Sequence, residues 1–80
     1  MEPWFSFLRI ESDLALTFIA SARLRRSPEA SAISIENASK ALAEIRRGLM
    51  RPHPGRYFTE HEIFFLEQRC AEIEAALAGL

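Results

Sequence analysis

Residues 51–63, which read RPHPGRYFTEHEI, contain the clearest local signals in the chain. Their first part, 51–56, holds two prolines and a glycine, which do not continue a regular helix. Thr59 and Glu62 then have the spacing of a capping box, in which each side chain accepts a hydrogen bond from the other residue's backbone N–H. The stretch therefore predicts a loop followed by a helix over about residues 60–78.

A second break, at Ser27-Pro28-Glu29, separates two longer helical segments. Serine is a favoured N-cap residue, proline suits the first helical position, and glutamate complements the positive end of the helix dipole. Apolar residues recur every three or four positions on both sides of this break. We therefore expect helices over about residues 5–26 and 28–50.

The apolar positions of the expected helices form rows that predict the core. The rows are Phe7, Ile10, Leu14 and Phe18 beside Leu8, Ala15, Ile19 and Ala22 in the first helix, Ile35, Ala38, Leu42, Ile45 and Leu49 in the second, and Ile63, Leu66, Cys70, Ile73 and Leu77 in the third. The double row indicates that the first helix packs against two neighbours. With a very short first connection, these rows predict an all-α, three-helix antiparallel bundle of up-down-up topology, formed by residues 1–80 as a single domain.

The composition is that of a globular protein, because 49% of the 80 residues are hydrophobic and 26% are charged. The chain has no run of about eighteen apolar residues, so we expect no membrane span. The first residues also lack the basic leader and the uninterrupted apolar run of a signal peptide. The single cysteine, Cys70, cannot form an internal disulfide and fits a reducing compartment. These features predict a cytoplasmic protein.

Basic residues gather near the ends of the first two helices, at residues 23–26 and 46–51. In an up-down-up bundle these two groups lie at opposite ends of the molecule. Each group has a structural explanation, because cations interact favourably with the negative end of their own helix. The acidic third helix, beside both groups, would repel phosphates. We therefore expect no nucleic acid partner.

Glu11 projects near the centre of the first helix's apolar arc, which is unusual for a charged residue. In one interpretation its carboxylate reaches water or pairs with an arginine of another helix. In the other, Glu11 is a buried polar site that binds a ligand or a partner, because an unpaired buried charge costs several kcal/mol.

Five large apolar residues are not obviously absorbed by the core rows. They are Trp4, Phe5, Ile33, Phe64 and Phe65. One interpretation is that Trp4 and Phe5 fold over one of the phenylalanines and cap the core. The other is that the five side chains form an exposed apolar patch, which marks a contact surface.

Residues suited to metal binding or catalysis are few. His53, His61, Glu60 and Glu62 lie at one end of the expected bundle, but their spacing matches no standard zinc pattern. Cys70 lies in a core row, which indicates an inert, buried thiol. We expect no metal, no cofactor and no enzymatic activity, because catalysis requires several polar groups that converge in one pocket.

The chain resembles a group of short, uncharacterised three-helix proteins of soil bacteria, whose helices are similar to tetratricopeptide and MIT-type helical domains. The resemblance is carried by ESDLALTF at residues 11–18, by a Pro-His loop, by Thr59 before an acidic helix, and by Ala38, Ala41, Leu42 and Ile45. It implies a helical interaction module and implies no activity. The tetratricopeptide signature is not matched, because no second repeat follows.

These observations favour a non-enzymatic protein–protein interaction module whose surplus aromatic residues contact a protein partner, most simply a second copy of the chain. A groove that accepts an amphipathic helix of another protein is a related hypothesis. The alternative is a helical bundle that binds a small ligand or a metal near Glu11 or near His53 and His61.

Overall fold

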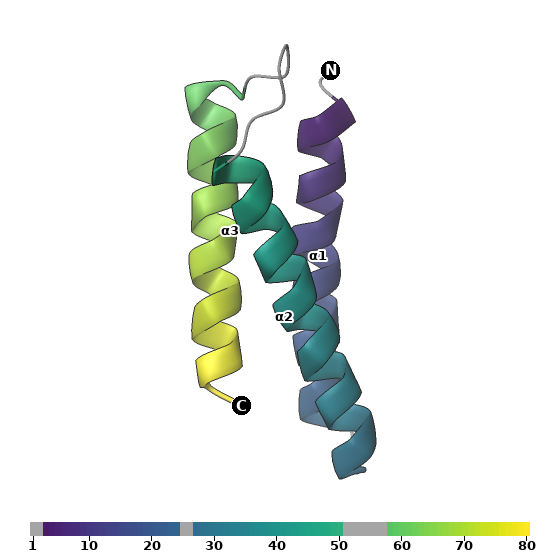
Figure 1. Ribbon diagram of the computed structural model, residues 1–80. Coiled ribbons are helices and arrows are strands. Elements are labelled where there is room, and N and C mark those ends of the chain that lie inside the picture. The colour runs from purple at the N-terminus through teal and green to yellow at the C-terminus, as the bar shows by residue number, and fades with distance from the viewer. Residues whose placement is uncertain (1–2, 25–26, 51–57) are drawn as a thin grey trace.

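The described residues of the computed structural model, which are 3–24, 27–50 and 58–80, form three α-helices. The helices are α1 (Pro3–Leu24), α2 (Pro28–Met50) and α3 (Glu60–Ala78). Successive helices run in opposite directions, and α2 is inclined to the other two (Figure 1). Each helix packs against both others, which confirms the prediction of an all-α, up-down-up bundle of three helices.

The helix bounds follow the sequence signals closely. Helices α2 and α3 have the expected ranges, whereas α1 begins at Pro3, two residues before the expected start. The expected end of the first helix at residue 26 and the loop over 51–56 lie outside the described residues. Within the described ranges, no helix has the length and apolar character needed to cross a bilayer.

The capping box at the start of α3 is present. The Thr59 N–H donates to Glu62 Oε1 at 2.8 Å, and the Glu62 N–H donates to Thr59 Oγ1 at 3.1 Å. Two of the N–H groups that a helix start leaves without a backbone partner are thereby satisfied. The same two residues therefore fix where α3 begins.

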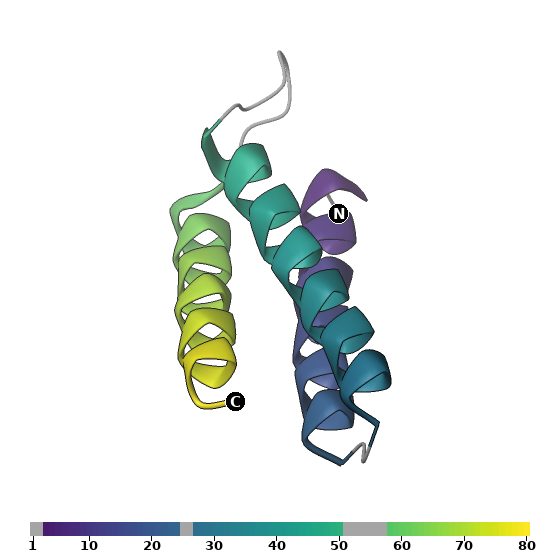
Figure 2. The same ribbon diagram turned by 60° about the horizontal axis from the view of Figure 1, so that its bottom comes forward.

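The start of α2 is capped and tied to the end of α1. The Ala30 N–H donates to Ser27 Oγ at 3.4 Å, which makes Ser27 the N-cap. The Ser31 hydroxyl donates to the Ala22 carbonyl at 3.2 Å and satisfies an acceptor in the last turn of α1. The Ser31–Ala22 bond joins the start of α2 to the end of α1, and the two helices run antiparallel from there (Figure 2).

Helices α1 and α2 form the closest pair in the bundle. Their facing rows alternate by four and three residues, and the rows consist of Leu8, Ser12, Ala15, Ile19 and Ala22 in α1 and Ser34, Ala38, Ala41, Ile45 and Gly48 in α2, all buried. Most of these side chains are small, so the two backbones approach closely. A methyl group on Gly48 would lie 2.7 Å from Leu8 Cδ1, which shows how little space separates the helices there.

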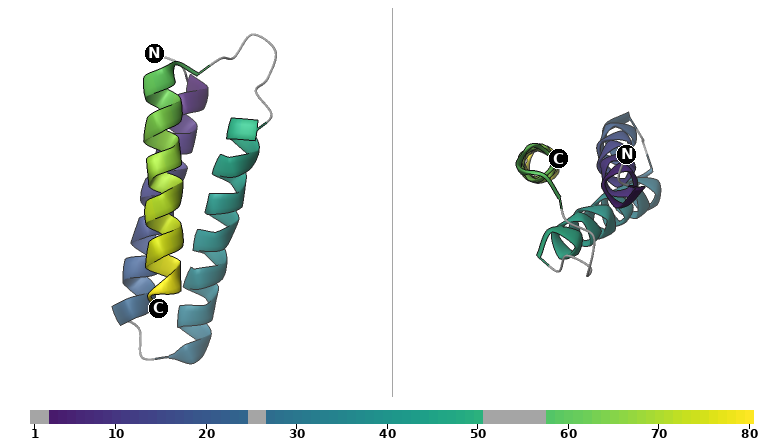
Figure 3. Two further views of the ribbon diagram at one scale, coloured as in Figure 1. Left: turned by 90° about the vertical axis from the view of Figure 1, so that its left-hand side faces the viewer. Right: turned by 90° about the horizontal axis from the view of Figure 1, so that it is seen from above.

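Helix α3 lies to one side of the α1–α2 pair (Figure 3). Its buried residues are Leu66, Cys70 and Ile73. Helix α3 forms an ion pair with each neighbouring helix. Arg69 Nη1 of α3 lies 3.2 Å from Asp13 Oδ1 of α1, and Glu74 of α3 pairs with Arg46 of α2. The third helix therefore covers one side of the pair, and the other side is left to solvent.

Two predictions about packing are wrong. In α1 only the second apolar row is buried, because Phe7, Ile10 and Leu14 are 42%, 52% and 43% exposed. Ile63, expected in the core row of α3, is exposed as well. Helix α1 contacts α2 and α3 through its other residues, so Phe7, Ile10 and Leu14 of the first row remain partly exposed.

Candidate functional site

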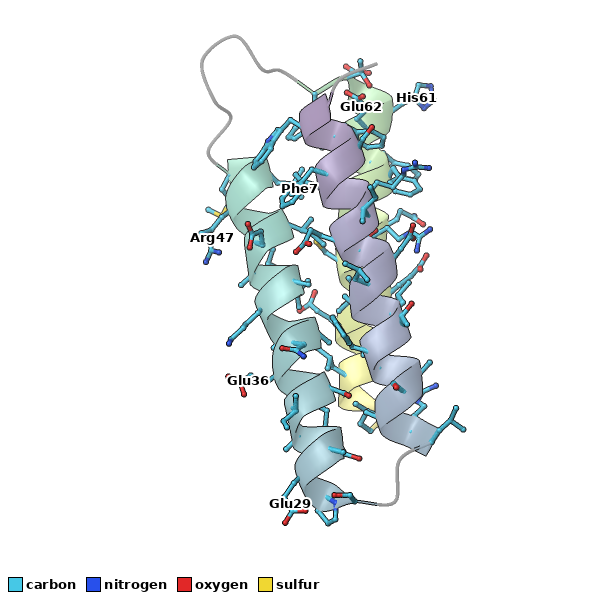
Figure 4. All side chains as sticks on the ribbon, turned by 90° about the vertical axis from the view of Figure 1, so that its right-hand side faces the viewer. Phe7, Glu29, Glu36, Arg47, His61 and Glu62 are labelled. Carbon is cyan, nitrogen blue, oxygen red and sulfur yellow. The ribbon has the colours of Figure 1, made fainter. Side chains whose placement is uncertain are left out.

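The exposed apolar row of α1 lies on the side of the bundle opposite α3. Phe7, Ile10, Leu14 and the half-buried Phe18 are three or four residues apart and therefore share one side of the helix. The Phe5 side chain points the other way, toward α3, where it contacts Phe65. Figure 4 views α1 with α3 behind it, and Phe7 lies there on the side of α1 that faces α2.

The row continues onto α2 through a shallow groove. A hollow of about 320 Å³ between the two helices is lined by Phe18, Thr17 and Ser21 of α1 and by Ile33 and Asn37 of α2. Ile33 is 60% exposed. The apolar surface therefore spans both helices and is not confined to one.

We call this surface the α1–α2 face. Its members are Phe7, Ile10, Glu11, Leu14 and Phe18 of α1 and Ile33, Asn37 and Glu44 of α2. Its exposure follows from the small residues beneath it: Ala38, Ala41 and Gly48 bring the backbones so close that larger side chains at the flank cannot enter the seam. An exposed, contiguous apolar surface of this kind is characteristic of contact sites.

Glu11 is half-buried, and the fully buried polar residue of α1 is its neighbour Ser12, whose hydroxyl donates to the Arg9 carbonyl at 2.7 Å. The structure therefore does not place the Glu11 carboxylate in the sealed interior that the buried-site interpretation required. No ion pair joins Glu11 to another described residue. Its carboxylate lies at the edge of the α1–α2 face.

The five surplus apolar residues do not form one patch. Trp4, Phe5 and Phe65 are half-buried and pack against the core. Trp4 stacks on Phe7 with ring centroids 5.6 Å apart, and Phe5 meets Phe65 edge-on at 5.8 Å. The cap interpretation therefore describes these three. Ile33 and Phe64 are the exposed members, and they belong to different faces.

Phe64 belongs to a second hollow, between α1 and α3. This depression of about 670 Å³ is lined by Phe5, Phe64 and Phe65 together with polar residues that include His61 and Arg69. The Arg69 guanidinium lies over the Phe65 ring, 5.1 Å from its centroid, and also pairs with Asp13. The aromatic floor of the depression is thus already in contact with a cation of the chain itself.

Metal-binding and nucleophilic residues are scattered in the part of the chain that the structure describes. No three His, Cys, Asp or Glu side chains there are close enough to hold a metal ion. His61 is exposed, and His53 lies outside the described residues. Burial raises the pKa of the Cys70 thiol, so the thiol is neutral near pH 7 and a weak nucleophile.

Sequence reasoning assigned Phe7, Ile10 and Leu14 to the core and so missed the α1–α2 face. A signal was present in the second helix, where Ser34, Ala41 and Gly48 lie beside the expected row. Small residues at this spacing predict a close helix approach, and a close approach leaves no room for a second large row.

Comparisons with protein-family models, with curated proteins and with solved structures gave no match.

Proposed function

We propose that this protein is a non-enzymatic helical interaction module that binds an amphipathic helix of a partner protein along the α1–α2 face. The observation that carries the proposal is the exposed row of Phe7, Ile10 and Leu14, which continues through Phe18 to Ile33 of α2. Apolar helices commonly dock into grooves between two helices, with anchors three or four residues apart.

A docked helix would complete the bundle on its uncovered side. Helix α3 packs on one side of the α1–α2 pair and buries Leu66, Cys70 and Ile73 there. A partner helix on the opposite side would cover the apolar row of α1 in the same way. The result would resemble a four-helix arrangement, in which each side of the closely packed pair is shielded from water.

The proposed module would act in the cytoplasm. Cys70 is a free thiol and is buried beside the α2–α3 seam, which is compatible with a reducing compartment.

An NMR titration tests the proposal. The probe is a synthetic amphipathic peptide with leucine along one helical seam, and the control is a peptide of the same composition in scrambled order. We expect amide shift changes at residues 7–18 and 33–44 with the first peptide only. Changes confined to α3, or none with either peptide, would contradict the proposed docking face.

A second candidate function, the binding of a small apolar ligand, is supported by the depression between α1 and α3. Its volume of about 670 Å³ falls in the range usual for ligand sites, and its lining combines aromatic rings with a few polar groups. An apolar fluorescent dye is a suitable probe. We expect Phe64→Ala to weaken dye binding and Leu14→Ala to leave it unchanged if this depression is the site.

A further inference from the structure

The α1–α2 face is apolar except for Asn37 and two carboxylates, and one of the carboxylates is Glu11. Phe7, Glu11, Leu14 and Phe18 are spaced by four, three and four residues, so Glu11 lies within the same row as the apolar side chains. It is half-buried, and no described residue forms an ion pair with it. A carboxylate in this position is available to a group that docks on the face.

The second carboxylate is Glu44 of α2. It follows Asn37 by two helical turns and is flanked in the sequence by the buried residues Ala41 and Gly48, so it lies on the same side of α2 as Asn37. Glu44 is half-buried, and its ion pair with Arg47 is long, at 3.8 Å between Arg47 Nη2 and Glu44 Oε2. Such an exposed pair contributes little and can be exchanged for another partner.

The two carboxylates lie at similar heights along the α1–α2 pair. Gly48 packs against Leu8, and the helices are antiparallel (Figure 1). Glu11 is three residues beyond Leu8 in α1, and Glu44 is four residues before Gly48 in α2, so axial steps of about 4.5 Å and about 6 Å separate them from this contact. The middle of the apolar face is therefore flanked by negative charge from both helices.

We propose that the partner helix carries a lysine or arginine within its apolar seam, and that Glu11 and Glu44 bind this cation. The inference rests on the proposed function, since it specifies which helix docks on the face. A helix with an entirely apolar seam would desolvate the carboxylates without pairing them, which is costly. A long basic side chain packs its methylene groups on the apolar row and places its charge between the two acids.

A second copy of the chain does not fit this requirement. The α1–α2 face contains no lysine or arginine among its members, so two such faces would bring their acidic pairs together without a cation. Lys40 and Arg47 border the face without belonging to it, and each pairs with a glutamate of its own helix. Charge complementarity therefore favours a different, basic amphipathic helix over self-association.

Two labelled peptides test this inference by fluorescence anisotropy. Both are amphipathic helices of about 20 residues, long enough to follow the groove. They differ at one central seam position, which is lysine in one peptide and norleucine in the other. We expect the lysine peptide to bind about tenfold more tightly at low salt, with the preference decreasing as salt is added.

Variants assign the preference to the two acids. In Glu11→Gln/Glu44→Gln we expect the lysine and norleucine peptides to bind equally. The matched control Glu67→Gln/Glu72→Gln changes two exposed glutamates of α3, outside the face, and removes the same net charge. We expect this control to keep the tenfold preference, which separates a local effect from the total charge.

Equal binding of both peptides to the wild-type protein would overturn the inference and leave the proposed function standing. Failure of both peptides to bind would remove the proposed function as well. Light scattering gives an independent check: a dimer that Leu14→Gln dissociates would identify a second copy as the occupant and would also overturn the inference.

Discussion

Gly48 of α2 packs directly on Leu8 of α1, and a methyl group added to Gly48 would lie 2.7 Å from Leu8 Cδ1. Leu8 is completely buried, so its side chain has little freedom to move away. The contact fixes the distance between α1 and α2 near one end of the pair. Trp4 Cζ2 lies 3.4 Å from the position of the added methyl group, and Phe7 stacks on the Trp4 ring while 42% of Phe7 stays exposed.

Gly48→Ala tests this contact. Alanine inside a helix is normally more stable than glycine by about 0.5–1 kcal/mol, but an extra methyl group in a filled core costs about 1–3 kcal/mol. We expect a net loss of free energy of unfolding, measured by urea denaturation. Gly79→Ala is the control, because its added methyl group would meet no atom closer than 3.6 Å. A Gly48→Ala variant more stable than wild type would show that the helices are further apart.

Thr59→Ala tests the capping box of α3. The substitution removes the acceptor for the Glu62 N–H, and we expect the free energy of unfolding to fall by about 1 kcal/mol. Thr17→Ala is a matched control, since the Thr17 hydroxyl bonds only the Asp13 carbonyl inside a continuous helix. If Thr59→Ala leaves the free energy of unfolding unchanged, the capping box does not fix the start of α3.

Two isoleucine-to-valine substitutions separate the core from the α1–α2 face. Ile45 is fully buried, whereas Ile10 is 52% exposed. We expect Ile45→Val to lower the free energy of unfolding by about 0.5–1.5 kcal/mol and Ile10→Val to change it by less than about 0.5 kcal/mol. Thermal or urea unfolding of dilute samples measures both. Equal decreases in the free energy of unfolding in the two variants would place Ile10 in the core, as the apolar spacing predicted.

The architecture was predictable because its signals are local. Thr59 and Glu62 are three residues apart and Ser27 precedes Pro28, so the helix starts depend on neighbours in the chain. The apolar spacing of Leu66, Cys70 and Ile73 likewise predicted the core side of α3.

The candidate site was not predictable in the same way, because it depends on the distance between two helices. The row of Phe7, Ile10 and Leu14 looks like a core row until the packing of Gly48 on Leu8 is known. Helix α3 ends at Ala78, and the φ of −85° at the following Gly79 is accessible to any residue, so the backbone there does not require glycine.

The Cys70 thiol makes the free energy of unfolding depend on pH in the alkaline range. Burial raises its pKa in the folded protein, whereas the unfolded chain has an ordinary value of about 8.5. The folded state therefore holds the proton more tightly, and this contribution to stability is complete below about pH 8.5 and is lost as the pH rises further. We expect the free energy of unfolding to fall as the pH rises above about 8.5, and to fall less steeply in Cys70→Ala. Identical slopes in the two proteins would contradict the burial of the thiol.

The central claim, that the α1–α2 face is the docking surface, is tested most directly by the affinity of a labelled leucine-seam peptide for two matched variants. Leu14→Gln alters this face, and Phe64→Gln alters an equally apolar, exposed position on α3. Loss of one buried leucine contact is worth about 1.5–3 kcal/mol, so we predict that Leu14→Gln weakens binding about tenfold or more while Phe64→Gln binds as the wild-type protein does. Weakened binding by Phe64→Gln with no change in Leu14→Gln would contradict the claim.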